Sequence, residues 1–327
     1  MNPRIAVTAG DPRGIGPEII SKALADPVVG GRSDLVIVGP HGCGIEPDVA
    51  VGEWHSGDGA PAAGRFAGLA IEKAVRLAMN GEVDGIVTAP IDKAALHDGG
   101  YDYPGHTEML AQITGAKVAM MLAATKPSGG EGSNPLRVVL ATTHLALREV
   151  PASIDRAVIV ETAEITRSGL RDWFGIAEPK IALCALNPHA GDGGRFGDED
   201  EKILAPAARK AGIAGPFPAD TVFVRAIRGE FDAVIAPYHD VGMTAIKVAS
   251  FGSAVNVTLG LPFPRTSPDH GTALDIAGRG IADPSSFIEA LLLCRRIAAL
   301  GPSRGGRPSS EGRLREDRSS SLPSTSR

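Results

Sequence analysis

The stretch IALCALNPHAGDGG, residues 181–194, contains the pattern that decides the fold. Six almost wholly apolar residues, enough for a buried strand, run directly into a loop with three glycines and one histidine. A strand that is apolar throughout is typical of a parallel sheet with both faces covered, because alternation is needed only where one face meets water. The stretch therefore predicts a buried strand that ends in a polar loop.

The same pattern recurs along the chain. The predicted strands are residues 5–8, 35–38, 86–89, 138–143, 181–186, 233–236 and 255–259. Segments with helical spacing of apolar residues lie between them, the clearest being 67–79 and 153–168. Strands that alternate with helices predict an α/β fold with helices on both faces of the sheet.

Composition narrows the class of protein. The 327 residues carry a net charge of −5, which disfavours nucleic acid as the main partner because phosphate neutralisation needs a basic face. The three cysteines show no paired spacing, and no apolar run reaches the length of a membrane span. We therefore expect a cytoplasmic protein with no membrane partner. Residues 302–327 are rich in serine and arginine and poor in aliphatic side chains, which predicts a disordered tail.

Six polar loops follow the apolar runs. They comprise residues 8–18, 88–96, 141–149, 186–194, 236–247 and 259–278. Ligands of open α/β sheets bind beyond the carboxyl ends of strands, and each of these loops carries a histidine, aspartate, lysine or arginine. The loops together predict one composite site.

Three loop histidines, His144, His189 and His239, each stand just past a predicted strand. Three neutral imidazoles bind a divalent ion well and leave a coordination position open for substrate. The alternative is that each histidine is a hydrogen-bonded structural residue of its loop. The glycines around His189 fit either a tight turn or a close approach of the backbone to a ligand.

Other candidates are weaker by themselves. The stretch GDPRGIGPEI, residues 10–19, only superficially resembles a dinucleotide fingerprint, because its glycines are spaced differently. His106 and Thr107 stand at a helix start, where they could hold an anion or simply cap the helix. Lys247, Arg265 and Asn256 could bind a phosphorylated or carboxylated substrate, or be ordinary surface and hydrogen-bonding residues.

Taken in order, the motifs resemble those of a known family. GDPRGIGPEI, PGHTE, TTHLALR, LNPHAGDGG, PAD, YHD, VNVTLGLPF and RTSPDHGTALDIAG are similar to the 4-hydroxythreonine-4-phosphate dehydrogenase family of pyridoxal phosphate biosynthesis. The resemblance implies a two-domain α/β/α architecture like that of isocitrate and isopropylmalate dehydrogenases, with the active site in the interdomain cleft. It implies residues 1–100 plus 270–301 as one domain, 101–269 as the other, and a homodimer with its sites at the interface.

The resemblance also assigns roles. It implies a divalent metal (zinc, cobalt or magnesium) on His144, His189 and His239, and NAD or NADP at His270, Gly271 and Asp275. It implies binding of the phosphorylated substrate by His106, Thr107, Lys247, Asn256 and Arg265. The implied reaction is oxidation of a secondary alcohol by hydride transfer to the cofactor, then decarboxylation of the β-keto acid, with Lys247 or Asp240 as base.

Five positions depart from the family pattern: Arg13, Val241, Ala245, Pro264 and Pro268. They favour a branch that acts on 4-phospho-D-threonate or 4-phospho-D-erythronate over one that acts on 4-phosphohydroxythreonine. Two alternatives stay open. One is a zinc hydrolase or lyase that uses the three-histidine metal to activate water, and the other is a non-catalytic relative of the family.

Overall fold

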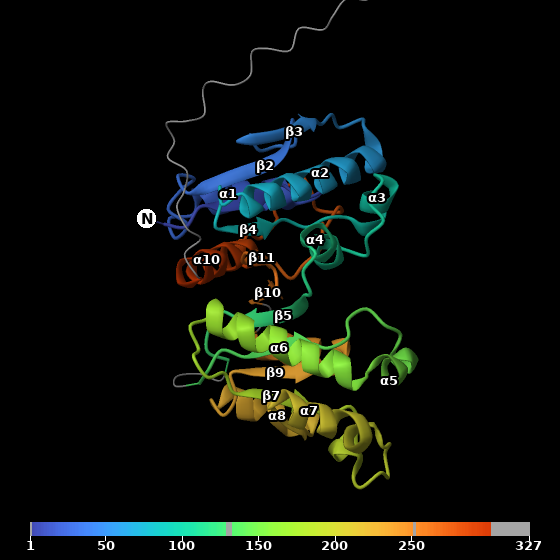
Figure 1. Ribbon diagram of the computed structural model, residues 1–327. Helices are drawn as coiled ribbons and strands as arrows, with labels where there is room; N and C mark the ends of the chain where they lie inside the picture. The colour runs from blue at the N-terminus through green and yellow to red at the C-terminus, as the bar shows by residue number, and fades with distance from the viewer. Residues whose placement is uncertain (1, 129–132, 251–252, 302–327) are drawn as a thin grey trace, which may run out of the picture.

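The computed structural model describes residues 2–128, 133–250 and 253–301, so the predicted disordered tail lies outside the described residues. Eleven described strands form one mixed sheet in the order β3-β2-β1-β4-β11-β10-β5-β6-β9-β7-β8. Helices cover the sheet along its length (Figure 1). The predicted α/β fold is confirmed.

The sheet consists of two parallel blocks joined by antiparallel strands. Strands β3, β2, β1, β4 and β11 are mutually parallel, as are β6, β9, β7 and β8, whereas β10 and β5 pair antiparallel to their neighbours. In chain order the strands are β1 (Ile5–Thr8), β2 (Leu35–His41), β3 (Val49–Glu53), β4 (Gly85–Thr88), β5 (Ala119–Ala124), β6 (Arg137–Leu140), β7 (Ile181–Cys184), β8 (Ala214–Phe217), β9 (Ala233–Ala236), β10 (Ala254–Leu259) and β11 (Arg265–Ser267).

Helices occupy most of the connections between the strands. They are α1 (Gly16–Ala25), α2 (Gly59–Met79), α3 (Lys93–Asp98), α4 (His106–Thr114), α5 (Val150–Ser153), α6 (Arg156–Asp172), α7 (Ala205–Ala211), α8 (Ala219–Ile227), α9 (His239–Ser250) and α10 (Ser285–Leu300). Short 3-10 turns cover Leu147–Glu149 and Pro188–Gly191, and a π-helical turn covers Asp200–Leu204. Among the described residues, no helix has both the length and the apolar character that crossing a bilayer would require.

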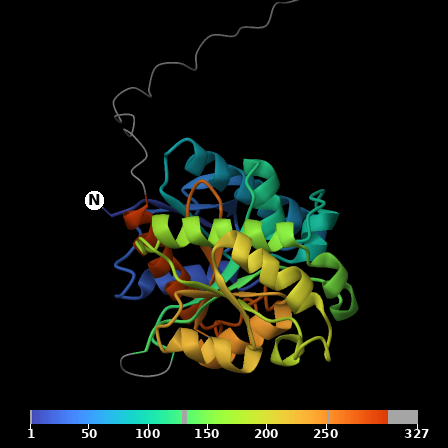
Figure 2. The same cartoon turned by 60° about the horizontal axis from the view of Figure 1, so that its bottom comes forward.

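The core shows why these strands are apolar on both faces. In β6, Val139 packs with helix α6 in one hydrophobic cluster, whereas the adjacent Val138 packs with α8 and α9 in another. Figure 2 shows the strands of this half running between α6 and the helices on the opposite side. Because successive side chains point to opposite faces, both must be apolar when helices cover both.

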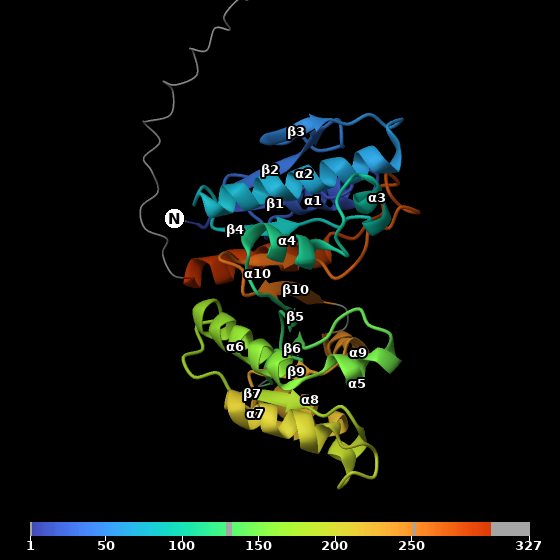
Figure 3. The same ribbon diagram turned by 45° about the vertical axis from the view of Figure 1, so that its right-hand side comes forward.

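Strands β10 and β5 lie at the middle of the molecule, between the two parallel blocks (Figure 3). Residues 1–100 plus 270–301, one predicted domain, contain β1 to β4, and residues 101–269, the other, contain β5 to β11. The sheet itself continues through both, because β11 pairs with β4 as well as with β10. The division into these two domains stays a prediction.

Four strands, β3, β5, β8 and β11, are missing from the sequence prediction. Strand β5 reads AMMLAA, which is rich in residues that favour helix, and β8 contains glycine and proline. Strand β11 is only three polar residues long. These segments become strands through pairing with distant partners, and local sequence does not carry that information.

The contact between α2 and α3 depends on Gly64. A Cβ at this position would lie 1.7 Å from the carbonyl oxygen of Ala95, far inside van der Waals contact. We expect Gly64→Ala to lower the free energy of unfolding by at least about 2 kcal/mol, because backbone rather than a flexible side chain would have to move. Gly57→Ala is the matched control, since a Cβ there meets nothing within 4 Å. Chemical denaturation measures both, and equal stability of the two variants would contradict this packing.

Candidate functional site

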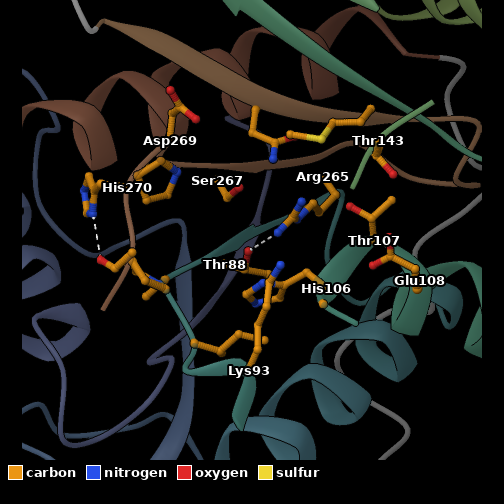
Figure 4. Close-up of a pocket in the computed structure, with 18 of the residues that line it drawn as sticks. Thr88, Lys93, His106, Thr107, Glu108, Thr143, Arg265, Ser267, Asp269 and His270 are labelled. Carbon is orange, nitrogen blue, oxygen red and sulfur yellow. Dashed lines mark hydrogen bonds between the residues drawn. The ribbon is translucent and has the colours of Figure 1, made fainter. Parts of the chain in front are cut away.

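The main cavity lies where the two parallel blocks of the sheet meet, and it has a volume of about 350 Å³. Its walls come from the ends of β4 and β11, the start of α4, the loop after β6, and strands β5 and β10 (Figure 4). The lining residues are Thr88, Ala89, Pro90, Ile91, Lys93, Gly105, His106, Thr107, Glu108, Met120, Thr143, His144, Asn256, Arg265, Ser267, Pro268, Asp269, His270 and Gly271. Four of the predicted substrate residues are therefore gathered in one place.

Arg265 is the strongest feature of this cavity. Its side chain is almost completely buried, and its Nη2 and Nη1 donate hydrogen bonds to the hydroxyls of Thr88 (2.6 Å) and Thr258 (3.0 Å). Its Nε has no partner, and the guanidinium forms no ion pair with a described carboxylate, although the charge of Glu108 in the same cavity acts on it. Burial lowers its pKa to about 10. A buried cation without a counterion is costly, so the cavity is suited to an anion.

Two further predicted substrate residues present unpartnered polar atoms. The Nε2 of His106 and the Oδ1 of Asn256 are buried, and neither has a hydrogen-bond partner in the described part of the chain. His106 is the first residue of α4, so Thr107 and the free backbone N–H groups of that helix face the same region. These groups offer both donors and acceptors to a polar ligand.

Burial, Arg265 and Lys93 together hold the pKa of His106 well below its ordinary value of 6.5. The folded protein therefore carries this histidine neutral, whereas the unfolded chain binds a proton once the pH falls below about 6.5. Since the unfolded state then binds more protons, stability falls as the pH drops through this window and is retained above it.

We expect His106→Gln to flatten the decline of the melting temperature between about pH 6.5 and 5. Thermal unfolding followed by circular dichroism across that range is the measurement. His97→Gln removes an exposed histidine outside the cavity and should leave the wild-type slope. Equal slopes in all three proteins would show that His106 is not held neutral.

Two of the three predicted metal ligands lie together. The rings of His144 and His239 have centroids 5.6 Å apart, and a small cavity of about 110 Å³ borders both and shares Thr143 and His144 with the main one. The Nδ1 of His239 contacts the Oδ1 of Asp240 at 2.7 Å, which leaves Nε2 free to bind a ligand. A carboxylate on the far nitrogen is the usual support of a metal-binding imidazole. Partial desolvation lowers the pKa of His144, which favours the neutral form that metals need.

His189 lies elsewhere in the chain, on the loop after β7, with its ring 6.4 Å from that of Phe196. Within the described ranges, no three histidine, cysteine or carboxylate side chains converge as a metal site. The loop is nevertheless built with strain, because His189, Ala190 and Asp192 all have positive φ. Buried Asp200 holds its base by accepting the backbone N–H groups of Leu186 and Asn187 at 2.8 and 2.9 Å. Such outliers cluster at functional sites, and the role of His189 stays a prediction.

The two predicted base candidates differ in surroundings. Lys247 forms an ion pair of 3.1 Å with Asp269, a residue that lines the main cavity. Asp240 is mostly exposed and touches His239. Lys247 is therefore tied to the cavity through Asp269, and Asp240 supports the ring of a metal-ligand candidate.

The three predicted cofactor residues do not all line the main cavity. His270 and Gly271 line the main cavity, whereas Asp275 is exposed on the loop that follows. His270 also borders a third cavity of about 370 Å³, together with Asp283 and residues at the start of α10. The glycine-rich loop before α1 packs against this segment, since the N–H of Ile15 donates to the carbonyl of Thr272 at 3.0 Å.

Several cavity residues were not named from the sequence: Thr88, Lys93, Glu108, Ser267 and Asp269. Thr88 and Lys93 belong to the segment 88–96, which the sequence predicts as a polar loop after a strand. Glu108 follows His106 and Thr107 in the PGHTE motif. In each case the sequence predicts the segment that borders the site, but it does not predict which side chains of that segment point into the cavity.

Of the five departures from the family pattern, only Pro268 lines the main cavity. Arg13 forms a two-point contact with the buried carboxylate of Asp11, with nitrogen–oxygen distances of 3.1 and 2.7 Å. Pro264 and Pro268 are buried, and Pro268 lines the main cavity. Val241 and Ala245 pack beside the core under α9. None of these changes removes a polar group that lines the cavity.

Comparison with known proteins identifies the family of this chain. The family described as "Pyridoxal phosphate biosynthetic protein PdxA" matches residues 38–294. A 4-hydroxythreonine-4-phosphate dehydrogenase of Geobacter metallireducens is 41% identical, over 94% of this chain and 98% of the relative. A protein of Bradyrhizobium diazoefficiens, provisionally named D-threonate 4-phosphate dehydrogenase, is 42% identical over 90% of this chain and 96% of its own.

Among solved structures, a 4-hydroxythreonine-4-phosphate dehydrogenase of Klebsiella pneumoniae is 38% identical with a TM-score of 0.79. The match covers 90% of this chain and 99% of that one. Fold and relatives thus define an α/β oxidoreductase, as the sequence predicted. The chain belongs to the PdxA family.

Proposed function

We propose that this protein is a metal-dependent, NAD(P)-linked dehydrogenase that oxidises the secondary alcohol of a phosphorylated four-carbon hydroxy acid. The observation that carries the proposal is the buried guanidinium of Arg265, which forms no ion pair with a described carboxylate and faces a cavity that His144 also lines. An anion site beside metal-ligand candidates is what such a substrate requires. The candidates are 4-phosphohydroxythreonine, 4-phospho-D-threonate and 4-phospho-D-erythronate, and the names of the relatives include the first two classes.

The phosphorylated substrate would bind through Arg265, His106, Thr107 and Asn256. Arg265 supplies charge, and the unpartnered atoms of His106 and Asn256 supply directed hydrogen bonds. Thr107 and the start of α4 add donors for an anion. The cavity volume of about 350 Å³ lies within the range of small-molecule sites.

His144 and His239 fit a divalent ion as a pair, by their 5.6 Å ring separation and the carboxylate behind His239. We place His189 of a second copy of the chain as the third ligand, since one copy does not bring it to the other two. This arrangement rests on the homodimer with shared sites that the family resemblance implies. When bound, zinc, cobalt or magnesium would polarise the reacting oxygen and lower the pKa of its hydroxyl.

The nicotinamide cofactor would lie along His270 and Gly271. The main cavity and the third cavity share His270, so one extended dinucleotide could occupy both, with its reactive end toward the substrate. Asp275 would contact it from the exposed part of the loop. Lys247, positioned by Asp269, is the candidate base that removes the hydroxyl proton, with Asp240 as the second candidate. The oxidised product is a β-keto acid, which loses carbon dioxide readily.

Cofactor binding separates this proposal from a hydrolase or lyase, since only the dehydrogenase needs a nicotinamide. Isothermal titration of the full chain with NAD and with NADP should show saturable binding of at least one, weakened by Asp275→Ala. No binding of either would favour metal-assisted hydrolysis.

The three cysteines in the described structure are unpaired and buried, which supports the expected reducing, cytoplasmic setting.

A further inference from the structure

Lys93 lines the main cavity, and the proposed substrate set does not include it. It is the first residue of α3 and stands below His106 in the close-up, opposite Arg265 (Figure 4). Its place is fixed by Asp92, whose Oδ1 accepts the backbone N–H of Ala95 at 2.8 Å and so caps the helix.

Lys93 is an exposed residue, and its ammonium forms no ion pair with the described residues. In the described parts of the chain, no carboxylate lies within 4.0 Å of its ammonium, although the neighbouring lysines Lys126 and Lys247 both form ion pairs. Its charge nevertheless reaches the site, because it contributes to the lowered pKa of His106. Lys93 lines the same cavity as Arg265 and Thr107.

The geometry at Gly105 places the ammonium more closely. A Cβ built on Gly105, the N-cap of α4, would lie 3.4 Å from the Oε2 of Glu108 and 3.9 Å from the Nζ of Lys93. The ammonium of Lys93 and the carboxylate of Glu108 therefore both lie close to the start of α4. Arg265 and Lys93 line the same cavity, and both help to lower the pKa of His106.

We propose that Lys93 is a further substrate-binding residue, which binds the phosphate group together with Arg265, Thr107 and the start of α4. A phosphate monoester is close to a dianion near neutral pH, and two unpaired cations match its charge. A carboxylate would need only one of them. This inference rests on the proposed function for the identity of the substrate, but phosphate binding itself requires neither metal nor turnover.

The test is isothermal titration of the full chain with inorganic phosphate. We expect Lys93→Met to weaken phosphate binding at least about tenfold, which corresponds to about 1.4 kcal/mol, and Lys93→Arg to restore most of it. Lys117→Met is the matched control, because Lys117 is exposed and pairs with Glu161 on α6 away from the cavity. Circular dichroism confirms that each variant is folded.

Unchanged phosphate affinity in folded Lys93→Met would overturn the proposal, as would the absence of phosphate binding to the wild-type protein. A loss confined to non-phosphorylated D-threonate, with phosphate binding intact, would assign Lys93 to a carboxylate instead and also overturn it. If phosphate binding depends on Lys93 but no candidate substrate is oxidised, the inference stands and the proposed function fails.

Discussion

Arg265→Met is expected to raise the KM for the phosphorylated substrate at least about a hundredfold, with a smaller effect on kcat. The guanidinium is buried and forms no ion pair with a described carboxylate, so the substrate anion gains a desolvated partner when it binds. Breaking such a pair leaves the other charge buried and alone, which costs about 2–5 kcal/mol. Steady-state kinetics with varied substrate measures the effect.

The same substitution should not unfold the protein. Methionine replaces the arginine with an apolar side chain of similar length, and exchanging a buried charge for apolar volume is often neutral or stabilising. Arg137→Met is the matched control, because Arg137 lies at the start of β6, stacked on Phe174 and outside the main cavity. A folded Arg265→Met enzyme with wild-type KM would show that the phosphate binds elsewhere.

Removing a metal-ligand candidate is expected to have the second large effect. His144→Ala and His239→Ala should each lose bound metal and at least about a thousandfold in kcat, because the alcohol would no longer be activated. Elemental analysis of the purified protein measures the metal content. His97→Ala is the control, since His97 is exposed and outside the cavity. Full metal occupancy in either cavity variant would contradict the assignment.

Mixing two inactive variants tests whether His189 binds the metal of a second copy of the chain. If His189 reaches the metal of a second copy, a mixture of inactive His144→Ala and inactive His189→Ala should recover activity. A mixed dimer keeps one intact site, so random exchange of equal amounts should restore about one quarter of wild-type activity. No recovery after verified subunit exchange would place all three ligands in one chain or exclude His189.

Much of the fold was predictable from local pattern. The runs at 5–8 and 233–236 became β1 and β9 with the predicted bounds, because strands buried on both faces are continuously apolar. Helix α2 begins at Gly59, eight residues before the predicted start, since its first turns are rich in glycine, alanine and proline. Strand β11 is not predicted from the sequence, because its three polar residues form a strand only through pairing with β4 and β10.

The sequence predicts which motifs form the site, but it does not predict which side chains of those motifs contact one another. Arg265, His106 and Asn256 meet in one cavity as the resemblance implied. Lys93 was not named, because an isolated lysine at a helix start has the same local sequence whether it faces solvent or a cavity. Nor does sequence say whether His189 meets the other two histidines within a chain or across two. The answer depends on how copies of the chain associate, and the local order of residues carries no information about that.

The central claim is tested most directly by turnover. The metal-stripped protein, with and without zinc, cobalt or magnesium, is incubated with each candidate substrate and with NAD or NADP, and reduced nicotinamide is followed by its absorbance. The account predicts metal-dependent production of reduced nicotinamide, with carbon dioxide released, from at least one of 4-phosphohydroxythreonine, 4-phospho-D-threonate and 4-phospho-D-erythronate. Absence of turnover for every combination in a folded, metal-loaded protein would contradict it.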